Sequence, residues 1–189
     1  EARYREAIAI RPDYAEAHNN LGLVLKSLGR LEEAVHCYEK TLEIQPGHVE
    51  ARWNLAIGLL LRGDLARGWE FYESRWRLKD LTTPIRDFPQ PPWEGEALDG
   101  KTILLHAEQG LGDTIQFVRY APLVAARGGR VVLEVGEELL ELLEGIPGVA
   151  TLVRRGEDLP AFDTHCPLLS LPGVFRTTLD TIPWTGPYL

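Results

Sequence analysis

The segment 108–113 carries the side chains best suited to chemistry in this sequence. It reads Glu-Gln-Gly-Leu-Gly-Asp and follows the short apolar run 102–105 by two residues. Two glycines allow a tight turn, and a carboxylate at the start of a helix can cap that helix or take a proton from a hydroxyl group. The segment therefore admits three interpretations: a dinucleotide site, a structural helix cap and a catalytic base.

The dinucleotide interpretation needs a third glycine or alanine and an acidic residue about 20 positions further on. Glu134 meets the second requirement, but Ile115 stands where a small residue permits close helix packing. Asp113 would also place a negative charge where a pyrophosphate should lie. A phosphate-binding loop is excluded, because no Gly-Lys-Ser/Thr sequence follows the glycines. The dinucleotide interpretation thus fits the residues least well.

In the structural interpretation, Asp113 caps the following helix and the glycines form the turn. A cap of this kind contributes about 1 kcal/mol and is common in proteins. It is compatible with any other role of the same carboxylate.

The elements around this segment alternate between strand and helix patterns. Strands are predicted at 102–105, 130–135, 150–153 and 162–165, with helices at 115–124 and 137–144. Such alternation is typical of a doubly wound parallel sheet, in which ligands bind beyond the carboxyl ends of the strands. His106 and His165 are predicted at the ends of neighbouring strands. There they would reach the same cleft or form structural hydrogen bonds.

The first part of the chain repeats itself at an offset of 34 residues, the period of a two-helix repeat. Recurring pairs include Glu16 and Glu50, Asn20 and Asn54, Leu21 and Leu55, Gly29 and Gly63, and Tyr38 and Tyr72. Gly29 is expected to close the first helix and Pro46 to end the second. These positions resemble the tetratricopeptide repeat over residues 1 to about 75.

The repeats resemble most those of O-linked N-acetylglucosamine transferases. There a ladder of asparagines lines the concave groove and holds the backbone of a bound polypeptide. The resemblance implies that Asn20 and Asn54 form a peptide groove. The alternative is that they cap or brace neighbouring turns.

Three regions follow from these patterns. Residues 1–80 form a half, a full and a degenerate tetratricopeptide repeat, and residues 101–189 form a Rossmann-like α/β domain. Residues 81–100 hold four prolines within a short stretch, which predicts an extended, semi-rigid linker. The expected fold class is thus α plus α/β.

The string 106–117, with 165–172 later, resembles bacterial tetratricopeptide proteins that have a glycosyltransferase-like C-terminal region. Its Gly-Leu-Gly-Asp is similar to a motif of the lipopolysaccharide heptosyltransferases, whose GT-B fold consists of two facing Rossmann-like domains. The resemblance implies that residues 101–189 are the N-terminal half of a GT-B fold and that Asp113 deprotonates an acceptor hydroxyl. The acceptor-site loop would then comprise His106, Glu108, Gln109, Gly110, Gly112 and His165.

Composition narrows the functional classes. A formal net charge of -8 without a basic patch excludes a nucleic-acid partner. Cys37 and Cys166 lie far apart, which argues against a metal site or a disulfide scaffold and favours a reducing, cytoplasmic location. No apolar run is long enough to span a membrane.

The chain has no methionine and begins with a helix-like segment, which predicts a truncated fragment. The donor, a nucleotide sugar, is expected on the second domain of a full-length parent glycosyltransferase. The fragment should hold no cofactor and no activity of its own. Its expected partners are a polypeptide in the repeat groove and a saccharide or protein acceptor. The alternative function is a non-catalytic protein-interaction scaffold.

Overall fold

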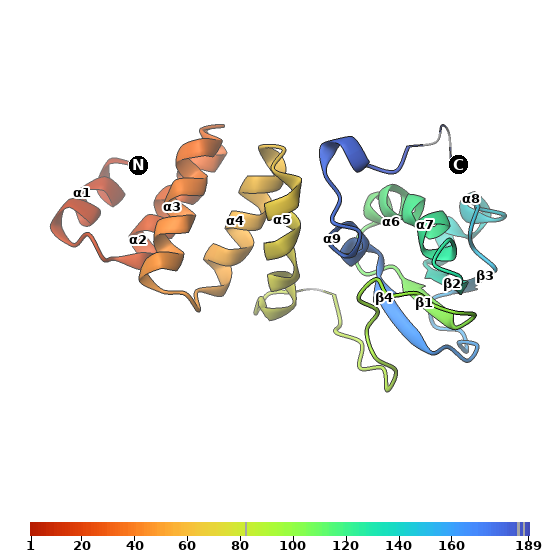
Figure 1. Cartoon of the computed structure of the whole chain (residues 1–189). Coiled ribbons are helices and arrows are strands. Elements are labelled where there is room, and N and C mark those ends of the chain that lie inside the picture. Colours follow the sequence, from red (N-terminus) through yellow and green to blue (C-terminus); the bar gives the residue numbers. More distant parts are fainter. Residues whose placement is uncertain (82, 185, 187) are drawn as a thin grey trace. The chain divides into compact units, whose positions relative to one another are not determined.

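The computed structural model describes residues 1–81, 83–184, 186 and 188–189 (Figure 1). The chain divides into two compact units. The repeat unit comprises Glu1–Leu81 with Thr177–Asp180, and the α/β unit comprises the described residues of Thr82–Arg176 and Thr181–Leu189. Helical repeats followed by a Rossmann-like parallel sheet confirm the predicted fold class.

The repeat unit is built from antiparallel helices joined by short turns. In order these are α1 (Ala2–Ile10), α2 (Ala15–Ser27), α3 (Leu31–Ile44), α4 (Val49–Leu61), α5 (Leu65–Tyr72) and the 3-10 helix η1 (Glu73–Arg77). Gly29 and Gly63 follow α2 and α4 with φ values of 75° and 86°. Glycine adopts this left-handed conformation without steric cost, so the predicted helix end at Gly29 is confirmed and Gly63 repeats it after α4. The helix end predicted at Pro46 is also confirmed, because α3 ends at Ile44.

Tyr38 is the central side chain of the repeat core. It is fully buried together with Ala34, which lies one turn earlier in α3. A Cβ atom at Gly22 of α2 would lie only 2.5 Å from Cε1 of Tyr38. Glycine at this position therefore lets α2 approach the tyrosine ring of α3.

The α/β unit contains four parallel strands in the order β3-β2-β1-β4. They are β1 (Thr102–His106), β2 (Arg130–Val135), β3 (Thr151–Arg154) and β4 (Thr164–Pro167). The predicted strands at 102–105 and 130–135 are confirmed, whereas β3 and β4 begin one and two residues later than predicted. Asp163 lies just before β4, where its carboxylate accepts a hydrogen bond from the amide of Thr102 at 2.7 Å.

Short helices follow β1, β2 and β4, whereas β3 leads to β4 through a loop. They are α6 (Leu111–Phe117), η2 (Val118–Tyr120), α7 (Ala121–Ala125), η3 (Glu137–Leu139), α8 (Leu140–Leu143), η4 (Leu168–Ser170), α9 (Leu171–Val174) and η5 (Leu179–Thr181). The helix predicted at 115–124 is thus three shorter pieces. Pro122 lies at the start of α7 and has no amide hydrogen, so the α-helical hydrogen bonding cannot run through this position.

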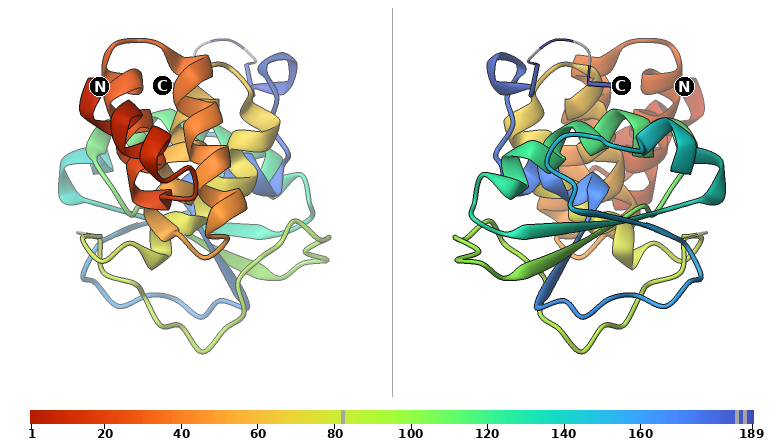
Figure 2. Two further views of the ribbon diagram at one scale, coloured as in Figure 1. Left: turned by 90° about the vertical axis from the view of Figure 1, so that its left-hand side faces the viewer. Right: turned by 90° about the vertical axis from the view of Figure 1, so that its right-hand side faces the viewer.

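The two faces of the sheet are covered differently. The helices of this unit lie on one face (Figures 1 and 2). On the other, Leu104, Val132 and Val153 pack against Phe88 and against Leu159 and Phe162 from the loop before β4. A doubly wound sheet carries helices on both faces, whereas extended chain covers the second face here.

Residues 83–93 supply much of this cover, and we call them the strap (yellow-green in Figure 1). The sequence predicts a linker at 81–100, but the described residues from 83 onward belong to the α/β unit. Trp93 and Leu98 are buried, with 2% and 0% of their surfaces exposed. Pro92 forms a parallel β-bridge with His165 at the edge of the sheet, a position that proline tolerates.

Candidate functional site

The loop after β1 lies at the topological switch point of the sheet. From β1 the chain moves to β2 and β3 on one side, whereas β4 lies on the other side. In parallel sheets, ligands bind outside the carboxyl ends of the strands at the position where the strand order reverses. The structure therefore places residues 107–110 and the start of α6 where a ligand is expected.

Asp113 is the third residue of α6 and is half-buried. Its Oδ2 atom accepts a hydrogen bond from the amide of Gly110 at 3.2 Å. The carboxylate thus caps the start of its own helix, as the structural interpretation predicts. Among the described residues, Oδ1 of Asp113 has no hydrogen-bond donor, so one oxygen can still accept a proton from a bound hydroxyl group.

Two side chains from other segments hold the backbone of the loop. Oγ1 of Thr83 donates to the carbonyl oxygen of Glu108 at 2.8 Å. Nη2 of Arg155, which follows β3, donates to the carbonyl oxygen of Ala107. Thr83 and Arg155 were not predicted as site residues, and no sequence motif connects them to a loop 25 and 48 positions away.

The predicted side chains of the loop differ in accessibility. Glu108 is buried, with 6% of its surface exposed. Gln109 is half-buried, and Gly110 and Gly112 are exposed. Gln109 and Asp113 are therefore the polar side chains of the loop that a ligand can reach without rearrangement.

His106 and His165 lie together on the helix-free face of the sheet. Nε2 of His106 is 3.4 Å from Nδ1 of His165. The ring of Phe88 in the strap contacts both, with centroid distances of 5.6 Å to His106 and 4.8 Å to His165. His165 is paired with Leu104 in the middle of β1 rather than placed at its carboxyl end. The two side chains thus make the hydrogen-bond contact that the structural alternative expects.

The environment of His165 favours its neutral form. Burial lowers the pKa of His165, and the nearby positive charge of Arg86 lowers it further.

Glu134 does not offer a free carboxylate to a ribose. It lies at the cross-strand position next to His106 and is 1% exposed. Its Oε2 atom forms an ion pair with Nη1 of Arg86 in the strap. The dinucleotide interpretation therefore loses the acid that it requires.

Asn20 and Asn54, the two asparagines predicted to line a peptide groove, have different surroundings. Nδ2 of Asn54 donates to Oδ1 of Asn19 at 3.1 Å, and the two residues are 8% and 7% exposed. This hydrogen bond joins α2 to α4, so Asn54 braces the two helices. Asn20 is half-buried and takes no part in the bond. The 34-residue repeat pairs Asn54 with Asn20, whereas the hydrogen bond joins Asn54 to Asn19, 35 positions away.

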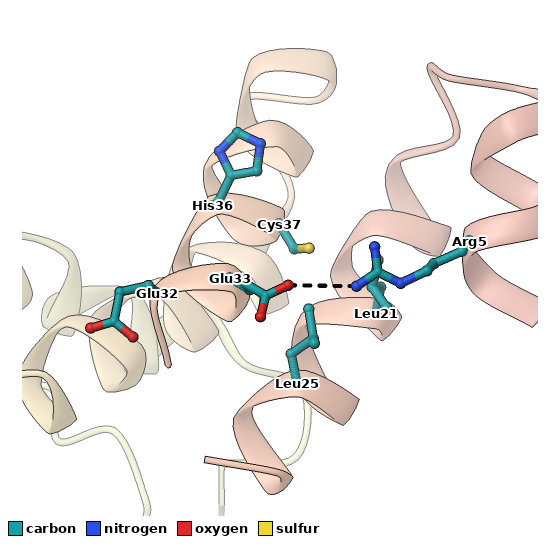
Figure 3. A pocket seen from close by; sticks show the side chains of 7 residues that line it. All are labelled: Arg5, Leu21, Leu25, Glu32, Glu33, His36 and Cys37. Atoms are coloured by element: carbon teal, nitrogen blue, oxygen red, sulfur yellow. Dashed lines mark ion pairs between the residues drawn. The ribbon is translucent and has the colours of Figure 1, made fainter. Parts of the chain in front are cut away.

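A small pocket lies in the repeat unit (Figure 3). Its volume is about 260 Å³, and it is lined by Arg5, Leu21, Leu25, Glu32, Glu33, His36 and Cys37. Arg5 and Glu33 form an ion pair across it at 3.5 Å. Pockets for small molecules usually measure roughly 300–1,000 Å³, so this pocket lies just below that range.

Neither a metal centre nor a membrane-spanning helix is found in the described part of the chain. It contains no group of three or more His, Cys, Asp or Glu side chains placed to hold a metal ion. It also contains no helix with the length and apolar character that crossing a membrane requires.

Comparison with known proteins identifies the repeat. Residues 15–48, which comprise α2, α3 and their connecting turns, match the family model of the tetratricopeptide repeat. Protein FlbA of Caulobacter vibrioides is 32% identical over 147 residues, which represent 75% of this chain and 25% of FlbA. The chain therefore spans about a quarter of this curated relative.

Solved structures match over parts of the chain. A crystal structure of MamA is 31% identical with a TM-score of 0.36, covering 38% of this chain and 42% of MamA. A mutant of the Thermobaculum terrenum O-GlcNAc transferase is 18% identical with a TM-score of 0.37, covering 79% of this chain and 30% of that protein. These scores are too low to support a conclusion about fold or function. The family match stands independently of them, and the helical pair α2–α3 is a tetratricopeptide repeat.

Proposed function

We propose that this chain is part of a glycosyltransferase-like protein. In this proposal the repeat unit binds a polypeptide, and the α/β unit forms the acceptor side of a sugar-transfer cleft. The observation that carries the proposal is the position of Asp113, at the start of α6 beside the switch point of the sheet. We place the protein in the reducing cytoplasm, in keeping with its two free cysteines, Cys37 and Cys166.

Asp113 would serve as the general base. Its Oδ1 atom takes the proton of an acceptor hydroxyl while the hydroxyl oxygen bonds to the anomeric carbon of the donor sugar. The bond from that carbon to the phosphate oxygen breaks, and the electron pair leaves with the nucleotide. A positioned carboxylate typically accelerates such a step by about 10²–10⁴-fold. Oδ2 stays bonded to the amide of Gly110 and fixes the orientation of the carboxylate.

The loop would position the acceptor. Gln109 is the accessible amide that could bind sugar hydroxyl groups, and the exposed Gly110 and Gly112 let a ligand approach the backbone closely. Thr83 and Arg155 hold two consecutive carbonyl groups of the loop, so the acceptor would meet a fixed backbone. We assign the nucleotide-sugar donor to the second domain of a longer parent protein, so that the 189-residue chain alone transfers no sugar.

The second candidate function is a protein-interaction scaffold without catalysis. The tetratricopeptide repeat at residues 15–48 supports it directly, because stacked helical repeats form extended binding surfaces for polypeptides. In that case the α/β unit would be a structural partner of the repeats and Asp113 only a helix cap.

The substitution Asp113→Asn in the longer parent distinguishes the two functions. Asparagine retains a side-chain oxygen for the amide of Gly110 but cannot act as a base. With a panel of nucleotide sugars, we expect the variant to lose transfer by at least about 10²-fold while its circular dichroism spectrum stays unchanged. Asp87→Asn is the matched control, since Asp87 is exposed and lies outside the loop.

Equal transfer by the Asp113→Asn variant and the wild type would refute the catalytic role. Absence of transfer by the wild-type parent with every nucleotide sugar would favour the scaffold. Turnover of a nucleotide sugar by the isolated 189-residue chain would contradict the assignment of the donor to another domain.

A further inference from the structure

The strap is attached to the edge of the sheet mainly through β4. The amide of Trp93 donates to the carbonyl oxygen of His165 at 2.8 Å, and the amide of His165 donates to that of Pro91 at 3.3 Å. Oγ1 of Thr164 donates to the same carbonyl of Pro91 at 2.8 Å. These bonds leave the strap dependent on the geometry of His165 and its neighbours.

The middle of the strap packs on two imidazole rings. Phe88 lies against His106 and His165, and its ring also contacts Phe162 edge-on at a centroid distance of 5.3 Å. Cζ of Arg86 lies over the ring of Phe88, 4.5 Å from its centroid. A change of charge on the imidazoles would therefore act on the residues that hold the strap.

The His106–His165 contact depends on protonation. Its nitrogen atoms, 3.4 Å apart, form a hydrogen bond only when one ring donates and the other accepts. If both rings carry a proton on each nitrogen, two donors face each other and the contact becomes repulsive. His106 is 4% exposed, so water cannot readily screen that repulsion.

Two charged groups approach His165 and its neighbour from different elements. Arg86 approaches from the strap and Glu134 from β2, and these two residues form an ion pair with each other. Their formal charges cancel, while Phe88 and Phe162 provide an apolar surround. A proton gained by His165 therefore adds a positive charge close to Arg86 in a half-buried, largely apolar environment, which is costly.

We propose that the strap is an acid-sensitive cover: it closes over the helix-free face of the sheet at neutral pH and opens when the His106–His165 pair becomes charged. Because Thr83 at the start of the strap holds the carbonyl of Glu108, opening also releases one support of the loop after β1. This inference goes beyond the proposed function and does not depend on whether Asp113 is a base.

The direction of the pH dependence follows from the environment of His165. Its pKa is lowered by burial and by Arg86, so the closed state binds protons less well than the open state. The stability of the closed state is complete above the ordinary histidine pKa of about 6.5 and decreases as the pH falls below that value. The equilibrium constant for closing decreases about tenfold for each pH unit, until the pH reaches the pKa of His165 in the closed state.

Hydrogen exchange of the 189-residue chain at pH 7.5 and pH 5.5 tests the proposal, with rates corrected for the intrinsic pH dependence of exchange. We expect protection to fall several-fold at pH 5.5 in peptides that cover 83–93 and 164–166. Peptides of α2–α4 should keep theirs. In a His165→Gln variant, which cannot titrate at this position, the loss should be much smaller. His36→Gln, at an exposed histidine of α3, is the matched control and should behave as the wild type.

Equal strap protection at the two pH values would overturn the proposal, as would the same loss in the wild type and in His165→Gln. An NMR titration of the wild-type histidines gives a second measurement if the variant does not fold. A pKa of His165 below about 6.5, with strap resonances that shift over the same pH range, supports the proposal. A pKa at or above that value refutes it.

Discussion

The buried hydrogen bond between Asn54 and Asn19 allows a quantitative test of the repeat unit. Asn54→Ala removes the donor and leaves Oδ1 of Asn19 without a partner between α2 and α4. Since both residues are at most 8% exposed, water cannot replace the lost bond without opening the helix contact. An orphaned buried acceptor costs about 1–3 kcal/mol. The higher helix propensity of alanine offsets about 0.5 kcal/mol of this cost, so we expect the free energy of unfolding to fall by about 0.5–2.5 kcal/mol.

Asn20→Ala is the matched variant, because it changes the same residue type in α2. Asn20 is half-buried, and its side chain forms no hydrogen bond within the described part of the chain. Its replacement should alter the free energy of unfolding by no more than about 0.5 kcal/mol. The double variant Asn19→Ala/Asn54→Ala removes both partners of the bond. It should be less destabilised than the sum of the single variants by about 1 kcal/mol.

Urea unfolding of the 189-residue chain, followed by far-ultraviolet circular dichroism, provides the measurement, because the repeat unit contributes most of the helix. A fully stable Asn54→Ala variant, or an equal loss for Asn20→Ala, would refute the assignment of Asn54 as a brace. Binding of a polypeptide partner can be measured on the same variants. Weaker binding by Asn20→Ala at unchanged stability would support the groove predicted for this position.

Two further predictions concern packing and charge. Gly22→Ala places a methyl group 2.5 Å from Cε1 of the fully buried Tyr38, so we expect the free energy of unfolding in urea to fall by about 1–3 kcal/mol. Gly47→Ala is the control and should be nearly neutral, because no atom lies within 4 Å of its new Cβ. Arg86→Met leaves the buried carboxylate of Glu134 uncompensated. Because the Arg86 side chain is itself 32% exposed, the free energy of unfolding should fall by about 2–3 kcal/mol, which is less than the 3–5 kcal/mol typical of fully buried pairs. An unchanged free energy of unfolding would show that the ion pair does not stabilise the fold.

Local patterns predicted the repeat unit well. The 34-residue offset located Gly29 and Gly63, whose positive φ values follow from their place after a helix. The buried Tyr38 also belongs to this pattern. In a repeat protein the contacting residues recur at a fixed spacing in the sequence, because each helix packs mainly on its immediate neighbours. A contact at another spacing, such as that of Asn19 with Asn54, does not follow from the 34-residue repeat.

The α/β unit was predictable in type but less so in detail. Apolar runs marked β1 and β2 because both strands are buried on two faces. The short edge strands β3 and β4 are partly exposed, so their boundaries were shifted by one or two residues. The position of the Gly-Asp loop at the end of β1 followed from its place directly after the apolar run 102–105. Its supports, Thr83 and Arg155, did not, since they come from segments whose pairing depends on the complete fold.

The strap shows which feature of the sequence was misread. Its prolines predict an extended chain with few amide donors, and this description fits a solvated linker and a segment laid along a sheet edge equally well. The apolar side chains distinguish the two cases. Phe88 and Trp93 occur within six positions, and exposing two aromatic rings to water would be unfavourable in a free linker. A proline-rich segment with that apolar content is better predicted as a cover. The same segment then brings Arg86 and Phe88 onto the histidine pair, which makes the cover sensitive to charge.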